Sequence, residues 1–119
     1  MVKPIFDTSK LDQLLAHRSR RNETERQELL KKVLQWLNQH GTQYGIRKAY
    51  IFGSLTQAHQ FHRNSDIDLA IEQTNPATFF SVIGYISEAM GRDVDLIQLD
   101  KCHFADRIRQ AGIQWTAID

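Results

Sequence analysis

The stretch IFGSLTQAHQFHRNSDIDLAI, residues 51–71, decides the fold. It begins inside a short apolar segment, residues 48–52, which predicts a strand that ends at Gly53. It closes on residues 66–72, where apolar and polar side chains alternate as they do in a half-buried strand. Two strands joined by a glycine turn and a polar loop indicate a sheet.

Helices are predicted on either side of these strands. Residues 23–40 carry apolar side chains at helical spacing, with Asn22 as N-cap, Glu25 completing a capping box and Gly41 as the stop. The other predicted elements are a short helix over residues 55–58, a loop over 59–65, a helix over 76–90, a third strand over 93–99 and a last helix over 103–111. The buried side of the helix over 76–90 is expected to hold Phe79, Phe80, Val82, Ile83 and Ile86.

This order predicts an α/β (α+β) domain, in which helices flank a small mixed sheet of three or more strands. Three strands make a thin sheet, so we expect a further strand from the tail, residues 113–119, or from a partner. The domain is predicted to span residues 23–119. Residues 1–22 are polar and read as an N-terminal arm that is partly helical.

Composition narrows the class of protein. The net charge of +1 argues against a protein that holds nucleic acid stably through a large positive field. The single cysteine, Cys102, allows no internal disulfide and fits the cytoplasm. There is no apolar run long enough to span a membrane and no apolar signal segment at the N-terminus, so we expect a cytoplasmic protein without a membrane partner.

Carboxylates gather on the predicted strands. Asp66 and Asp68 are two residues apart, so they share one face of a strand and can converge on Mg²⁺, which prefers oxygen ligands. Asp95 in the next strand is the third candidate, either as a metal ligand or as the group that accepts a proton. Asp93 shares that face and is the reserve, since it lies nearer the turn. The alternative is that these are polar residues on the exposed face of amphipathic strands, although Asp is depleted in strands.

Gly53-Ser54 follows a strand and precedes a predicted helix. Glycine permits close approach of the backbone to a phosphate, and serine can donate a hydrogen bond to a phosphate oxygen. The alternative is an ordinary turn with Ser54 as the helix N-cap.

The combined pattern resembles a known family. A strand that ends in Gly-Ser, then Ser-Asp-Ile-Asp-Leu, then Val-Asp-Leu in a later strand is similar to the minimal nucleotidyltransferase (MNT) domains of the polymerase-beta-like superfamily. The resemblance covers roughly residues 30–115. It implies that Gly53 and Ser54 hold a nucleoside triphosphate, that Asp66 and Asp68 bind the metals, and that Asp95 completes the triad and activates the acceptor.

One departure concerns the basic residue near the phosphates. Many members carry a glycine-containing basic stretch soon after Gly-Ser, whereas this chain has Thr56-Gln57-Ala58-His59. Arg63 is the substitute candidate. A structural zinc site at His59 and His62 is not expected, because a second pair of soft ligands is missing.

Only about 20 residues follow the third predicted strand, so the acceptor is expected to come from a partner, another subunit or a macromolecular substrate. HRNSDIDLAI, and DVDLIQLD followed later by GIQW, look like the MntA-type antitoxins of HEPN/MNT toxin–antitoxin modules. That resemblance implies transfer of AMP from ATP, with Mg²⁺, to a tyrosine of a HEPN toxin. A toxin-binding module without turnover, and adenylylation of a small molecule such as an aminoglycoside, are the alternatives.

Overall fold

A four-stranded mixed sheet forms the centre of the computed structural model, which describes residues 8–72 and 76–117. The strands are β1 (Lys48–Phe52), β2 (Ile67–Glu72), β3 (Val94–Gln98) and β4 (Ile113–Thr116), in the order β3-β2-β1-β4. β1 is antiparallel to both β2 and β4, while β2 and β3 are parallel. The predicted fold class and strands are thus confirmed. β4 supplies the fourth strand expected from the tail, of which residues 118–119 lie outside the described residues.

Within the described residues, three α-helices flank the sheet. They are α1 (Ser9–Trp36), α2 (Pro76–Met90) and α3 (Ala105–Ala111). Shorter helical segments are the π-helical turn η1 (Leu37–Gly41) and the 3₁₀ turns η2 (Thr42–Tyr44), η3 (Gly53–Thr56) and η4 (Leu99–Lys101). The predicted helix over residues 76–90 matches α2 at both ends. No helix in the described ranges combines the length and apolarity that crossing a membrane would need.

The first helix differs from its predicted bounds. α1 begins at Ser9, so Asn22 lies inside the helix and is not its N-cap, while residues 1–7 of the predicted arm lie outside the described residues. The physical reason is that residues 9–22 contain no glycine or proline to end a helix. Gly41 is not the stop either, because helical turns continue to Gly45, which takes the left-handed conformation with φ +78°.

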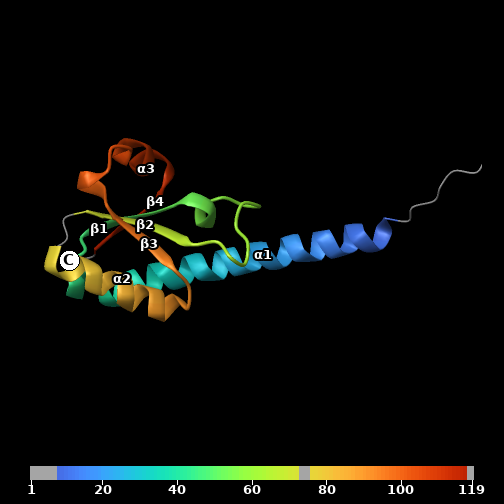
Figure 1. Cartoon of the computed structure of the whole chain (residues 1–119), viewed down its shortest axis with the longest axis horizontal. Helices are drawn as coiled ribbons and strands as arrows, with labels where there is room; N and C mark the ends of the chain where they lie inside the picture. Colours follow the sequence, from blue (N-terminus) through green and yellow to red (C-terminus); the bar gives the residue numbers. More distant parts are fainter. Residues whose placement is uncertain (1–7, 73–75, 118–119) are drawn as a thin grey trace, which may run out of the picture.

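The two faces of the sheet are covered differently (Figure 1). α2 and the C-terminal half of α1 pack on one face, and α3 lies over the other. The first face carries the main core, with fully buried side chains that include Val33, Leu37, Ile51, Ile67, Leu69, Ile71, Val82 and Ile86. The second face carries a smaller core built on Tyr50, Ala70, Leu99 and Ile108.

The prediction that Phe80 of α2 lies in the core is wrong. Phe80 is 78% exposed, whereas Val82 and Ile86 are fully buried and Phe79 and Ile83 pack at the edge of the core. Phe80 stands just outside the narrow stripe that faces α1 and the sheet. Its ring packs edge-to-face on Phe79 instead, with 5.5 Å between the ring centroids.

Candidate active site

The end of β1 and the beginnings of β2 and β3 meet at one end of the sheet. Asp68 in β2 is the register partner of Phe52 in β1 and of Asp95 in β3. Because paired residues in neighbouring strands point to the same face, the Asp68 and Asp95 side chains lie side by side, on strands about 4.8 Å apart. Asp66 lies two residues before Asp68, immediately ahead of β2. The sheet thus brings three carboxylates to one corner.

The electrostatics of Asp68 reflect this crowding. Asp68 is half-buried, whereas Asp66 and Asp95 are exposed. Burial raises the pKa of the Asp68 carboxyl above its ordinary value, and the negative charges of Asp95 and Asp66 raise it further. Asp93 lies outside β3, and it is not among the carboxylates that raise the pKa of Asp68. The geometry therefore couples Asp68 to Asp95 rather than to Asp93.

The glycine turn directly adjoins this corner. Gly53 has φ +75°, and a Cβ atom built on it would overlap the Asp68 carboxylate. Gly53 therefore meets two requirements at once: a left-handed backbone and close approach to a carboxylate. The predicted short helix over residues 55–58 is instead the four-residue 3₁₀ turn η3, because Gln57 is already extended.

Ser54 is the second residue of η3, so it does not cap a helix as the alternative interpretation required. It is half-buried, and its hydroxyl has no hydrogen-bond partner among the residues that the structure describes. The turn is held by other groups. The Thr56 hydroxyl donates to the Gly53 carbonyl over 2.8 Å, and the Gln57 N–H donates to the Ser54 carbonyl over 3.2 Å. The Ser54 hydroxyl is thus left available beside Gly53.

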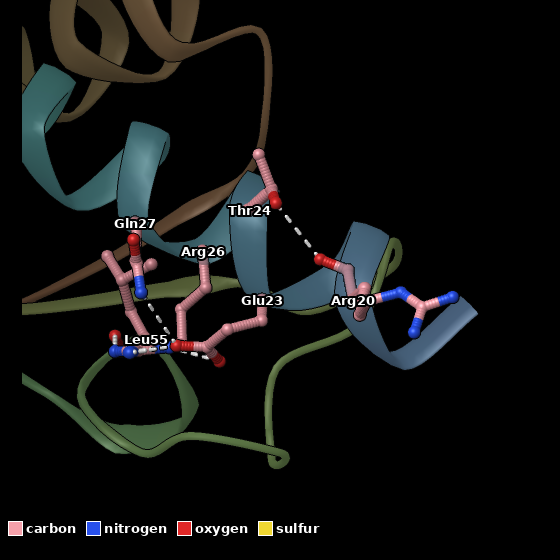
Figure 2. Close-up of polar contacts among 6 residues, drawn as sticks. All are labelled: Arg20, Glu23, Thr24, Arg26, Gln27 and Leu55. Atoms are coloured by element: carbon pink, nitrogen blue, oxygen red, sulfur yellow. Dashed lines mark hydrogen bonds and ion pairs between the residues drawn. The ribbon is translucent and has the colours of Figure 1, made fainter. Parts of the chain in front are cut away.

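An arginine of α1 anchors the turn from outside (Figure 2). Arg26 Nη1 donates to the Leu55 carbonyl over 3.0 Å, while its Nε and Nη2 donate to the Glu23 carboxylate over 3.0 and 2.5 Å. The hydrogen bond from Arg26 also lowers the pKa of Glu23 to about 2. Both residues lie on α1, so the ion pair fixes the guanidinium and, through it, the position of η3. Sequence reasoning did not identify Arg26, because the contact spans 29 positions.

A second arginine anchors the loop that leads to Asp66. Arg92 Nη1 donates to the Ser65 carbonyl over 2.6 Å, and its guanidinium lies 4.8 Å from the centre of the Phe61 ring. Ser65 is itself buried, and its Oγ accepts a hydrogen bond from the His62 N–H over 3.0 Å. Sequence reasoning missed Arg92 as well. The available signal was its position directly before Asp93-Val94-Asp95.

The comparison with known families matches this arrangement. The family described as "Polymerase beta, Nucleotidyltransferase" matches residues 30–116, which include all three carboxylates and the glycine turn. The chain belongs to this nucleotidyltransferase family. No curated protein sequence matches this nucleotidyltransferase significantly.

Solved structures show the same fold. A toxin–antitoxin crystal structure with AMP-PNP is 25% identical to this nucleotidyltransferase, with a TM-score of 0.57 and 73% of each chain covered. A mutant of the toxin–antitoxin MntA-HpeT is 24% identical, with a TM-score of 0.54 and coverage of 73% of this chain and 72% of that one. The toxin–antitoxin MntA-HepT is 22% identical, with a TM-score of 0.52 and coverage of 76% and 73%. This nucleotidyltransferase therefore resembles chains of toxin–antitoxin complexes.

The donor set of the nucleotidyltransferase suits a hard cation. No group of three or more His, Cys, Asp or Glu side chains within residues 8–72 and 76–117 is gathered closely enough to hold a metal by itself. The carboxylates at the corner nevertheless supply oxygen donors only, and the charge repulsion on Asp68 is of the kind that a cation relieves. Mg²⁺ characteristically takes one or two carboxylates and completes its ligands with water and substrate phosphates. The residues therefore fit an ion that binds together with a nucleotide.

Arg63 forms none of the described contacts that define the corner. Its side chain is exposed and lines a 650 Å³ cavity together with Arg18 and Arg21 of α1. None of the described contacts joins Arg63 to Asp68 or to the glycine turn. His59 and His62 are exposed loop residues in the nucleotidyltransferase.

Proposed function

We propose that this chain is a Mg²⁺-dependent adenylyltransferase that moves AMP from ATP to a hydroxyl of a partner protein. The partner is a HEPN-type toxin, the acceptor hydroxyl is that of a tyrosine, and the chain acts in the cytoplasm as the antitoxin. Family membership supports the transferase class. The likeness to toxin–antitoxin structures, one of them with AMP-PNP, supports the nucleotide and the partner.

The observation that carries the proposal is the pairing of Asp68 with Asp95 beside Gly53. In this proposal Asp66 and Asp68 hold Mg²⁺, with Asp95 as a third ligand. Gly53 and Ser54 offer a backbone and a hydroxyl to the triphosphate, and Arg63 supplies a positive charge for it. Bound Mg²⁺ would withdraw charge from the phosphate oxygens.

Asp95 is proposed to orient the acceptor hydroxyl and take its proton. The acceptor oxygen forms a bond to the α-phosphorus, the bridging bond between the α- and β-phosphates breaks, and pyrophosphate leaves. Asp95 suits this role because it is exposed, whereas Asp68 is half-buried and carries the raised pKa.

The test is label transfer to a co-expressed HEPN toxin. ATP labelled at the α-phosphate should label the toxin, while ATP labelled at the γ-phosphate should not, which separates adenylylation from phosphorylation. Asp68→Asn and Asp95→Asn should each reduce the initial rate by about 100-fold or more. Asp100→Asn is the matched control, because Asp100 is an exposed aspartate in η4 just beyond β3.

Chelation of Mg²⁺ should abolish labelling, and added Mg²⁺ should restore it. The proposal fails if the toxin remains unlabelled while the Asp68→Asn protein still neutralises it in cells, since binding alone would then suffice. Labelling of an aminoglycoside, but of no protein, would assign a small-molecule acceptor instead.

A further inference from the structure

The N-terminal half of α1 forms a surface that the domain does not use. α1 runs past the end of the sheet (Figure 1), and every residue from 8 to 21 is exposed. The family match begins only at residue 30, so this part of the helix lies outside the nucleotidyltransferase domain as that family defines it. Helices are stabilised mainly by tertiary packing, and packing on the sheet does not stabilise this part of α1.

Apolar side chains follow one side of this half-helix. Leu11, Leu14 and Leu15 are 54%, 67% and 53% exposed. Their spacing of three and four residues places them in one stripe along the helix. Large exposed apolar side chains in a contiguous stripe are characteristic of a protein-binding surface.

Basic side chains lie along the same half-helix. Arg18 is in line with the leucines, Lys10 and Arg21 lie beside them, and Arg20 is on the opposite side of the helix. Lys10, Arg18, Arg20 and Arg21 carry positive charge against the single acidic residue Asp12 in the same segment. None of the four basic side chains forms an ion pair with any residue that the structure describes. Figure 2 shows the Arg20 side chain extending away from the Glu23–Arg26 pair. By contrast, Arg26 and Arg109 elsewhere in the chain are both paired. We call residues 10–21 the basic leucine face.

The basic leucine face continues toward the carboxylate corner. Arg18 and Arg21 line the 650 Å³ cavity together with His62, Arg63 and Asn64 of the loop before β2. Asp66 follows this loop directly. A chain bound along the face would therefore lie next to the segment that carries the first carboxylate.

We propose that the basic leucine face docks an acidic amphipathic helix of the protein that accepts the nucleotidyl group. The inference rests on the proposed function for the identity of that protein. The leucine stripe requires an apolar partner surface, and the unpaired cations require acidic side chains along its border. Both are features of one helix with leucines on one side and glutamates beside them.

Two other occupants fit less well. RNA would pair with the arginines but has no use for an aliphatic stripe, because its bases stack on aromatic side chains and on arginine. A second copy of this chain would match the leucines but would bring the same excess of positive charge against itself. The acidic helix satisfies both halves of the surface.

The surface can be tested apart from the chemistry. The probe is a fluorescent peptide with leucine at helical spacing and glutamate elsewhere, and the comparison peptide carries lysine in place of glutamate. Fluorescence anisotropy at 50 and 300 mM NaCl should show binding of the glutamate peptide, weakened at the higher salt. Equal binding of the two peptides, or binding of neither, overturns the proposal.

Variants of the full chain locate the binding. Leu11→Ala combined with Leu14→Ala, and separately Arg18→Glu combined with Arg21→Glu, should each raise the dissociation constant tenfold or more. Phe80→Ala is the apolar control, because Phe80 is even more exposed than Leu11 and Leu14 but lies on α2. Lys31→Glu combined with Lys32→Glu is the matched charge control further along α1. Controls that weaken binding as much as the test variants contradict the assignment.

The acceptor protein then separates this proposal from the proposed function. If the peptide binds but no acceptor is labelled, the docking role of the basic leucine face is supported and the proposed transferase function is contradicted. If the acceptor is labelled at the wild-type rate by both test variants, the face is not its docking site. A single-stranded RNA that binds more tightly than the peptide, or a dimer in light scattering that the leucine variant dissociates, would assign the surface to RNA or to a second copy and overturn the proposal.

Discussion

The Asp68 side chain is where charge, burial and the close approach of a glycine meet. Its pKa lies above the ordinary value of 3.8, because burial and two neighbouring carboxylates disfavour the charged form. A raised carboxyl pKa means that the folded state binds the proton more tightly than the unfolded state. Stability is therefore lost as pH rises through the interval between 3.8 and the raised value, and it stays lost above it.

Asp68→Asn should consequently raise the melting temperature at pH 7 without metal, even though it is expected to slow transfer strongly. The gain should shrink as the pH is lowered through that interval, because the wild-type carboxyl then becomes neutral. Thermal unfolding followed by circular dichroism at several pH values checks this. Mg²⁺ with AMP-PNP should stabilise the wild type more than the variant. An Asn variant that is less stable than the wild type at pH 7 would show that the repulsion is relieved in some other way.

Alanine substitutions at Gly53 and Gly45 distinguish the cost of backbone strain from the cost of a clash with the Asp68 carboxylate. Both glycines have positive φ, +75° and +78°, but a Cβ at Gly45 meets nothing within 4 Å, whereas at Gly53 it meets the Asp68 carboxylate. Gly45→Ala should cost about 1–2 kcal/mol of stability from the left-handed backbone alone and leave transfer unchanged. Gly53→Ala should cost more stability than Gly45→Ala and should also lower the transfer rate, because Asp68 must move.

Urea denaturation and label transfer measure the two effects. Equal transfer rates for the Gly45→Ala and Gly53→Ala proteins would mean that the contact between Gly53 and Asp68 has no part in the reaction.

At the scale of the elements, the junction of η1 with β4 is tightly packed. The Trp115 Nε1–H donates to the Asn38 Oδ1 over 2.7 Å, and a Cβ at Gly41 would lie 2.7 Å from the Trp115 Cη2 atom. Gly41→Ala should therefore destabilise the chain by about 1–3 kcal/mol, through overpacking against a large ring.

Gly84 is the matched control. It lies in α2 with nothing within 4 Å of a Cβ, so Gly84→Ala should stabilise the chain by about 0.5–1 kcal/mol. Opposite signs in urea denaturation are expected. A Gly41→Ala protein as stable as the wild type would mean that Trp115 can shift without loss.

The strands were predictable, because alternation with a period of two and a bounding glycine are local signals. β1 matches its predicted bounds fully, β2 begins one residue later than predicted, and β3 is shorter than predicted by one residue at each end. The helix ends were harder to predict. Asn22 is a residue type common at helix N-caps, but α1 runs through it. Gly41 is a residue type common at helix ends, but it packs against Trp115 and the helical turns continue past it. The prediction that Phe80 is buried was wrong, because helical spacing does not give the width of the buried stripe. Arg26 and Arg92 reach distant carbonyls, which no local pattern encodes.

The site could be placed only in part from the sequence. That Asp66 and Asp68 share a face follows from strand geometry, but the choice between Asp93 and Asp95 depends on the register of β3 against β2. The structure pairs Asp95 with Asp68. The roles of these residues remain predictions, which the label-transfer variants address.

At the scale of the whole molecule, the chain has two parts that differ in burial. α1 has 28 residues and runs past the end of the sheet, so it makes an otherwise small domain long (Figure 1). The C-terminal half of α1 contributes Val33 and Trp36 to the main core, while the N-terminal half is exposed throughout. Amides in the exposed half can open without disturbing the sheet, because only helix hydrogen bonds hold them.

Hydrogen exchange should show this division directly. Amides of residues 10–20 should exchange at least about 100-fold faster than those of residues 30–36, because opening the second group requires the core to open as well. Proline provides the matched pair of variants, since Ala16 and Gln35 are both exposed positions of α1. Ala16→Pro should leave the unfolding midpoint of the domain nearly unchanged, whereas Gln35→Pro should cost about 3 kcal/mol or more. Uniform protection along α1, or equal losses from the two prolines, would mean that the exposed half is coupled to the core. Slower exchange of residues 10–20 in the presence of the glutamate peptide would connect this free half of the helix to the docking role proposed for it.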